Sequence, residues 1–103
     1  MDKPRIYVDF NEMLTDKIVL LSKDDIKKDS IGNVITFYEG MPISIYSDNE
    51  ENGKQDNLIA DGIAIKYDLR EYKIWNHVKW CCKIDENGIR YESDLIKKEN
   101  KST

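Results

Sequence analysis

The segment VKWCCKIDENGIRY, residues 78–91, decides the fold class. Apolar side chains occupy every second position from Val78 to Ile84, which is the period-2 pattern of a strand with one buried face. The alternation extends back to Lys73 and predicts a long strand over residues 73–84. The turn that follows contains Asn87-Gly88, the strongest short-range hairpin signal, so residues 89–92 are expected to return beside this strand.

Other strand-like segments precede this one, and they are residues 5–10, 17–22, 34–38, 43–46 and 58–67. In the first of them the expected buried face carries Ile6, Val8 and Phe10, and the opposite face carries Arg5, Tyr7 and Asp9. Within 58–67, Asp61-Gly62 predicts either a tight turn or a bulge, and the long pattern on both sides favours the bulge. These segments together predict a mainly β fold. Because short sheets avoid open edges by closing, we expect a single small barrel of about six strands, SH3-like in size and topology class.

The rival interpretation is an α+β fold with a helix in residues 11–28. Apolar residues between Met13 and Leu21 could share a helical stripe. The β-branched pair Ile18-Val19 favours a strand instead. Residues 22–30 are mostly polar and are expected to form a loop, with one helical turn at most.

At 103 residues the chain has room for one domain with one core. We expect this domain to span residues 1–96 and the charged residues 97–103 to be disordered. No apolar run is long enough for a transmembrane helix, and the N-terminal residues lack the apolar core of a signal peptide. The two cysteines are adjacent, so they do not form a disulfide framework. These features indicate a cytoplasmic protein with reduced thiols and no membrane association.

The formal net charge of −4 disfavours broad binding to nucleic acid. The charges are unevenly placed, because acidic residues gather in 48–61 and basic residues in 66–83. A local basic face is therefore compatible with an acidic protein.

Residues 48–57 (DNEENGKQDN) contain no apolar side chain and are expected to form a long, mobile, acidic loop. Its residues that fit positions of an EF-hand calcium loop are Asp48, Glu50, Asn52, Gly53 and Asp56. Ile59 stands where the bidentate glutamate is required, and the flanking segments have strand patterns rather than helical ones. The sequence therefore predicts no calcium site here, and we expect no metal.

The residues that most often carry catalysis do not form a recognisable site. Along a strand, His77 and Cys81 would stand about 13 Å apart, too far for a nucleophile and its base. Cys81 and Cys82 point to opposite faces, so we expect Cys82 in the core and Cys81 on the solvent side or under a neighbouring loop. Nothing near the carboxylates Asp24, Asp25 and Asp29 supplies the apolar pocket that would raise a carboxyl pKa. We therefore expect no enzyme activity and no cofactor.

Aromatic and basic side chains mark the remaining candidate site. On the predicted long strand, Trp75 shares a face with several basic residues. A Trp side chain that points outward can anchor a protein partner or stack on a nucleobase. A one-residue bulge would instead turn Trp75 into the core. The candidate binding residues are Tyr46, Tyr72, Lys73, Trp75, His77 and Lys79.

The function that these observations favour is a non-enzymatic protein-interaction module with an unidentified protein partner. Two alternatives stay open. One is a nucleic-acid-associated small β-barrel. The other is an inhibitor or immunity-type protein whose acidic loop blocks a basic site on a toxin or nuclease.

Overall fold

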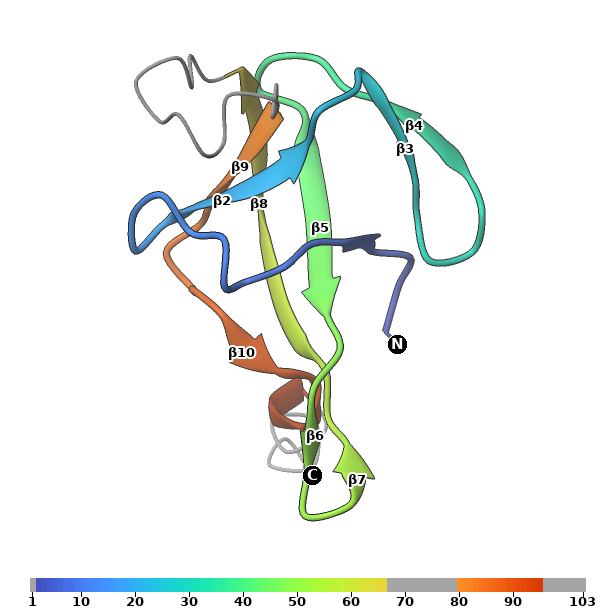
Figure 1. The fold of residues 1–103 in the computed structure, drawn as a ribbon, viewed down its shortest axis with the longest axis vertical. Coiled ribbons are helices and arrows are strands. Elements are labelled where there is room, and N and C mark those ends of the chain that lie inside the picture. Colours follow the sequence, from blue (N-terminus) through green and yellow to red (C-terminus); the bar gives the residue numbers. More distant parts are fainter. Residues whose placement is uncertain (1, 67–79, 96–103) are drawn as a thin grey trace.

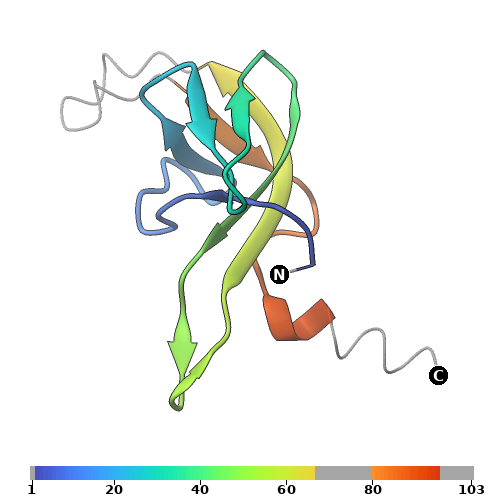
Figure 2. The same ribbon diagram turned by 90° about the vertical axis from the view of Figure 1, so that its right-hand side faces the viewer.

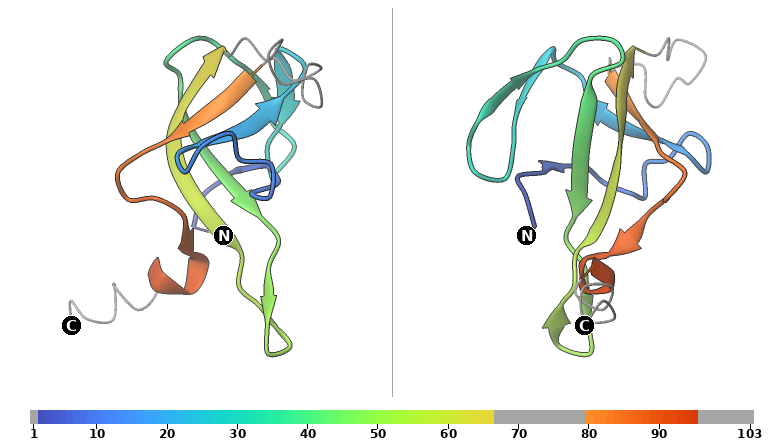
Figure 3. Two further views of the ribbon diagram at one scale, coloured as in Figure 1. Left: turned by 60° about the vertical axis from the view of Figure 1, so that its left-hand side comes forward. Right: turned by 180° about the vertical axis from the view of Figure 1, so that it is seen from behind.

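The computed structural model describes residues 2–66 and 80–95, and these are built around one strongly curled sheet (Figure 1). Its main path follows the order β1-β5-β8-β9-β2, and β10 pairs with β8 beside that path. The curl makes the sheet a half-barrel (Figure 3), so the prediction of a mainly β fold with a small barrel-like sheet is confirmed. The strands are β1 (Ile6–Tyr7), β2 (Ile18–Ser22), β3 (Ile26–Lys28), β4 (Val34–Thr36), β5 (Pro42–Ser47), β6 (Glu50–Glu51), β7 (Lys54–Gln55), β8 (Leu58–Lys66), β9 (Trp80–Ile84) and β10 (Arg90–Tyr91).

The α+β alternative is wrong. Its helix would occupy residues 11–28, where the structure has β2 and β3. The expected loop at 22–30 is also wrong, because Ile26–Lys28 pairs with Val34–Thr36 as a separate two-stranded sheet. The only helix in the described residues is a single turn at 92–95. Within the described residues, no helix has the length and hydrophobicity that spanning a membrane requires.

The main core lies on the inner face of the curled sheet. On β9 the inward side chains are Trp80, Cys82 and Ile84, as the alternation predicts. Phe37 packs against Trp80 with ring centroids 5.7 Å apart. The other buried members of this core are Ile6, Val8, Val19, Leu21, Ile43, Ile45, Ala60 and Ala64.

A smaller apolar cluster lies on the opposite face of the sheet, where Leu20 packs with Cys81. Leu14, Ile18 and Ile65 cover it. Cys81 is therefore fully buried rather than on the solvent side, which agrees with the second of the two positions expected for it.

Gly62 is neither a turn nor a bulge. The register of β8 with β5 runs without interruption from Ile63 to Leu58, and its register with β9 runs from Gly62 to Lys66. The predicted bulge is therefore wrong. A Cβ atom at Gly62 would overlap the carbonyl oxygen of Lys83 and lie 2.8 Å from its carbonyl carbon. Glycine at this position allows the β9 backbone to approach β8 closely where the sheet curls.

The turn after β9 does not make the predicted hairpin. Gly88 N–H donates to the Asp85 carbonyl at 3.1 Å, so a turn is present. The strand that follows, β10, pairs with β8 and not with β9. Ile84 lies opposite Gly62 of β8, and Arg90 lies opposite Ile59. The chain therefore uses six residues to pass along a length of β8 that spans three. The 85–89 segment is thus a detour between two strands that lie along one edge of β8.

Residues 48–57 are not a loose loop, which corrects the prediction. β6 and β7 pair antiparallel as a two-stranded hairpin, here called the finger (residues 49–56), which extends away from the half-barrel (Figures 1 and 2). Asn52 and Gly53 form its two-residue turn with φ values of 52° and 79°. Positive φ at both positions defines a type I′ turn, whose twist matches that of paired strands.

Candidate functional site

Of the candidate binding residues, only Tyr46 falls in the described part of the chain. It lies half-buried on β5, and its ring meets that of Tyr7 edge-on with centroids 5.6 Å apart. Tyr72, Lys73, Trp75, His77 and Lys79 lie outside the described residues. The predicted aromatic-basic face therefore stays a prediction.

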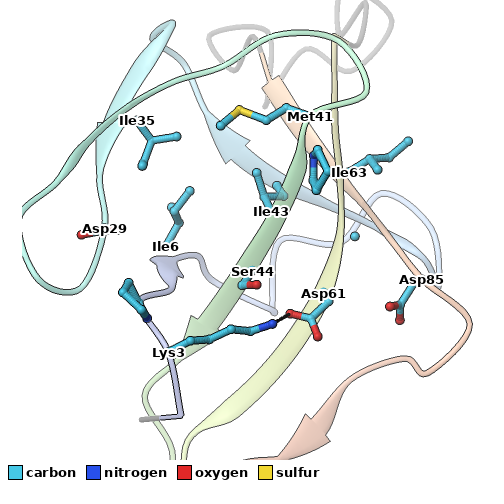
Figure 4. A pocket seen from close by; sticks show the side chains of 13 residues that line it. Lys3, Ile6, Asp29, Ile35, Met41, Ile43, Ser44, Asp61, Ile63 and Asp85 are labelled. Atoms are coloured by element: carbon cyan, nitrogen blue, oxygen red, sulfur yellow. Dashed lines mark ion pairs between the residues drawn. The ribbon is translucent and has the colours of Figure 1, made fainter.

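A groove of about 560 Å³ separates the β3–β4 hairpin from β5 and β8 (Figure 4). Its volume lies within the range of small-ligand sites. Ile6, Ile35 and Ile43 supply apolar lining from three different elements. Polar groups stand at its border, where Lys3 meets Asp61 at 3.3 Å. The groove thus combines apolar lining with a charged border.

The charged border continues into a set of five residues, the Asp61 cluster, which consists of Asp2, Lys3, Arg5, Asp61 and Arg90. Arg5 Nη1 donates to Asp61 Oδ1 at 3.1 Å, and Arg90 Nη2 lies 3.4 Å from Asp61 Oδ2. Arg5 also donates through Nε and Nη2 to the two carboxylate oxygens of Asp2, both at 3.0 Å. The cluster connects the N-terminal segment to β8 and β10.

Arg5 is the residue that the alternation misplaced. The pattern puts it on the outer face with Tyr7, yet its side chain is only 1% exposed. Besides the two carboxylates, it donates to the backbone carbonyls of Ile45 and Ala60 at 3.3 and 3.0 Å. A buried guanidinium needs such partners for all of its donors. No local feature of the sequence predicts this, because Ala60 and Asp61 lie more than fifty residues further along the chain.

The Asp61 cluster makes stability depend on pH. For Asp2, the hydrogen bonds from Arg5 lower the carboxyl pKa below its ordinary value of 3.8. For Asp61, desolvation acts to raise the pKa, but the hydrogen bond from Ser44 and the charges of Arg5 and Lys3 outweigh it, so that pKa is also lowered. A carboxyl with a lowered folded pKa contributes stability that is complete above its unfolded pKa and is lost as the pH falls through the folded pKa.

We expect the urea midpoint to fall between about pH 6 and about pH 3, because the unfolded chain takes up protons on these two carboxylates at a higher pH than the folded chain does. Equilibrium unfolding at a series of pH values measures it. Asp61→Asn is expected to be less stable at pH 6 but to lose less stability on acidification. A variant whose midpoint falls as steeply as that of the parent chain would show that other carboxylates dominate.

The outer face of the β3–β4 hairpin exposes large apolar side chains. Register pairs Ile26 with Thr36 and Lys28 with Val34, so these four side chains share the outer face, while Ile35 points inward to the core. The exposed fractions are 52% for Ile26, 69% for Ile31 at the tip, 59% for Val34 and 59% for Tyr38 after the strand. We call the four exposed apolar residues Ile26, Ile31, Val34 and Tyr38 the hairpin face. Figure 2 shows the hairpin in front of the curled sheet.

The inner side of the hairpin is firmly attached to the rest of the domain. Lys27 Nζ donates to the carbonyls of Tyr7 and Leu21 at 2.6 and 3.0 Å. Trp80 Nε1 donates to Asp25 at 3.0 Å, at the start of the hairpin. At its tip, Ser30 N–H donates to the Arg5 carbonyl at 2.8 Å. The hairpin face is therefore presented on a braced support and not on a free loop.

No protein-family model, curated protein or solved structure matches this chain.

The finger presents exposed carboxylates at Glu50 and Glu51, and Asp48, just before the finger, is also exposed. Its base is closed by Asp56 N–H, which donates to the Asn49 carbonyl at 2.8 Å. Ile59, which occupies the position of the missing EF-hand glutamate, is fully buried on β8. Among the described residues, no group of three or more His, Cys, Asp or Glu side chains is arranged to hold a metal ion.

The two cysteine thiols are free and both are buried. Desolvation raises the pKa of Cys81 to about 11 and that of Cys82 to about 12. A thiol is a nucleophile only as the thiolate, so at neutral pH both groups are nearly unreactive. They belong to the two apolar clusters and are poor candidates for redox or covalent chemistry.

Proposed function

We propose that this chain is a non-enzymatic protein-interaction module that binds its partner through the hairpin face. The observation that carries the proposal is the exposure of Ile26, Ile31, Val34 and Tyr38 on one braced hairpin. Scattered apolar side chains are normal on a protein surface, but several gathered on one element are typical of an interaction site. The groove beside the hairpin extends the apolar surface that a partner can contact.

Protein is favoured over nucleic acid as the partner. Among the paired residues of β3 and β4, Lys28 is the one lysine on the outer side beside the hairpin face, and the net charge of the chain is −4. Phosphate-backbone binding depends on clustered positive charge and weakens steeply with salt. The nucleic-acid alternative therefore predicts oligonucleotide binding at about 50 mM salt, and the proposal predicts none.

The proposal includes two further features. The curled sheet supports assignment to the SH3-like small barrels in size and topology class. The two free, buried thiols support a reducing, cytoplasmic location.

A second candidate function is an inhibitor or immunity-type protein that inserts the finger into a basic site. The observation that favours it is that the acidic residues stand on an ordered hairpin rather than on a loose loop. A preformed hairpin has less conformational entropy to lose on binding than a flexible segment has.

Affinity capture with two matched variants tests both candidates. Ile26→Thr/Val34→Thr removes apolar surface from the hairpin face while keeping β-branched side chains, and we expect about tenfold weaker capture of the partner. Glu50→Gln/Glu51→Gln removes the charge of the finger and is expected to leave capture unchanged. The reverse result would favour the inhibitor function. Equal melting temperatures in all three proteins would show that the fold is intact.

A further inference from the structure

The sequence holds two Asn-Gly dipeptides, Asn52-Gly53 at the tip of the finger and Asn87-Gly88 after β9. Asparagine followed by glycine is chemically labile, because the glycine nitrogen can attack the asparagine side-chain amide with no side chain to shield it. The reaction requires the backbone to leave its folded geometry and the attacking N–H to be free of an acceptor. The structure treats the two dipeptides differently in both respects.

At the finger, little opposes the reaction. All six residues from Glu50 to Gln55 are exposed, and the strands contribute only two residue pairs, Glu50 with Gln55 and Glu51 with Lys54. Among the hydrogen bonds of the described residues, none has Gly53 N–H as its donor. Two-stranded hairpins of this kind are marginally stable, so the tip opens at small cost in free energy.

At the other dipeptide, the nitrogen that would attack is already occupied. Gly88 N–H donates to the Asp85 carbonyl at 3.1 Å, and Asn87 N–H donates to Asp85 Oδ1 at 3.0 Å. Asp85 itself is bound to the sheet, because its N–H donates to the Asp61 carbonyl at 2.9 Å. Opening this turn requires several bonds to break together.

We propose that Asn52 is a site of spontaneous deamidation that modifies the tip of the finger. The Gly53 nitrogen loses its proton and attacks Asn52 Cγ, forming a new N–C bond as the C–N bond of the side-chain amide breaks and ammonia leaves. Water then opens the resulting succinimide at either carbonyl, which yields aspartate or isoaspartate. The net reaction consumes one water and releases one ammonia, with no change of oxidation state.

The modification changes both the charge and the shape of the finger. Either product adds a carboxylate beside Glu50 and Glu51. Isoaspartate also adds a carbon to the main chain, and a lengthened main chain does not fit the two-residue turn in which Asn52 and Gly53 have φ values of 52° and 79°. The isoaspartate form is therefore expected to lose the β6–β7 pairing while the half-barrel stays folded.

Ageing the full chain at 37 °C and mildly alkaline pH in heavy-oxygen water tests the inference, because each water that opens a succinimide leaves a labelled oxygen. Tryptic cleavage separates the dipeptides, since Asn52 lies in peptide 29–54 and Asn87 in peptide 84–90. In the native protein we expect labelled product at Asn52 to exceed that at Asn87 by about tenfold. In urea both sites are expected to react at similar rates.

Two results would overturn the inference. One is equal labelling of the dipeptides in the native protein, and the other is faster labelling of Asn87. Asn52→Gln provides the control for site assignment, because it should remove the label from peptide 29–54 and leave peptide 84–90 unchanged. Label that persists in 29–54 of this variant would place the reaction at Asn33 or Asn49 instead.

Discussion

Gly62→Ala is expected to lower the free energy of unfolding by about 3 kcal/mol or more. The added methyl group would overlap the carbonyl oxygen of Lys83 and lie 3.0 Å from the Cα of Ile84. These are backbone atoms of β9, which is paired on both sides in the sheet, so no flexible side chain can move aside. Relief of the overlap requires β8 and β9 to separate where Gly62 faces Ile84. Urea unfolding followed by tryptophan fluorescence measures the loss, since Trp80 is buried in the same core.

Gly40→Ala is the matched control for this prediction. Gly40 has a φ of 85°, but a Cβ atom there would meet nothing within 4 Å. Gly40→Ala is therefore expected to lower the free energy of unfolding by about 1 kcal/mol, through backbone conformation alone. If Gly62→Ala were no more destabilising than Gly40→Ala, the close approach of β9 to β8 would be wrong.

Arg5→Met is expected to lower the free energy of unfolding by about 3 kcal/mol. Methionine fills much of the same volume but donates no hydrogen bond. The substitution leaves Asp2 and Asp61 without their shared guanidinium, and it removes the donor to the Ile45 and Ala60 carbonyls. Breaking a buried ion pair from one side costs more than the pair contributes, because the remaining groups lose their partner in a poorly solvated place.

Lys3→Met tests whether burial is the reason. Lys3 also pairs with Asp61, at 3.3 Å, but its side chain is 46% exposed. Exposed ion pairs contribute little, so we expect a change within about 0.5 kcal/mol. Equal losses in the two variants, measured by urea unfolding, would contradict the central position assigned to Arg5.

The local alternation of apolar residues predicted the inward face of β9 correctly. Trp80, Cys82 and Ile84 face the core because successive side chains of a strand point to opposite sides, which is a property of the backbone itself. Local sequence also predicted a strand rather than a helix at β2, because the β-branched residues Ile18 and Val19 suit a pleated surface. Arg5 broke the pattern because its burial depends on Asp61 and on the carbonyl of Ala60, which only the folded chain brings near.

The two Asn-Gly dipeptides show the limit of short-range signals. Asn87-Gly88 predicted a hairpin and makes none, while Asn52-Gly53 lies in a segment predicted to be a loop and does make one. The backbone explains the difference: Asn52 and Gly53 both have positive φ, whereas at the second dipeptide only Gly88 does. After Gly88 the chain pairs, as β10, with the part of β8 that β9 leaves unpaired. No turn residue specifies which edge is open.

The candidate binding surface depended on tertiary structure in the same way. The sequence by itself determined a mainly β domain, the inward face of β9 and the acidic character of residues 48–57. Only the folded chain decided that Ile26 and Val34 stay exposed, because the inner side of their hairpin is bound by distant residues. Lys27 of the hairpin donates to the Tyr7 carbonyl, Trp80 donates to Asp25, and the Arg5 carbonyl accepts from Ser30. Alternation is written in neighbouring residues, whereas burial depends on which distant segments cover a face.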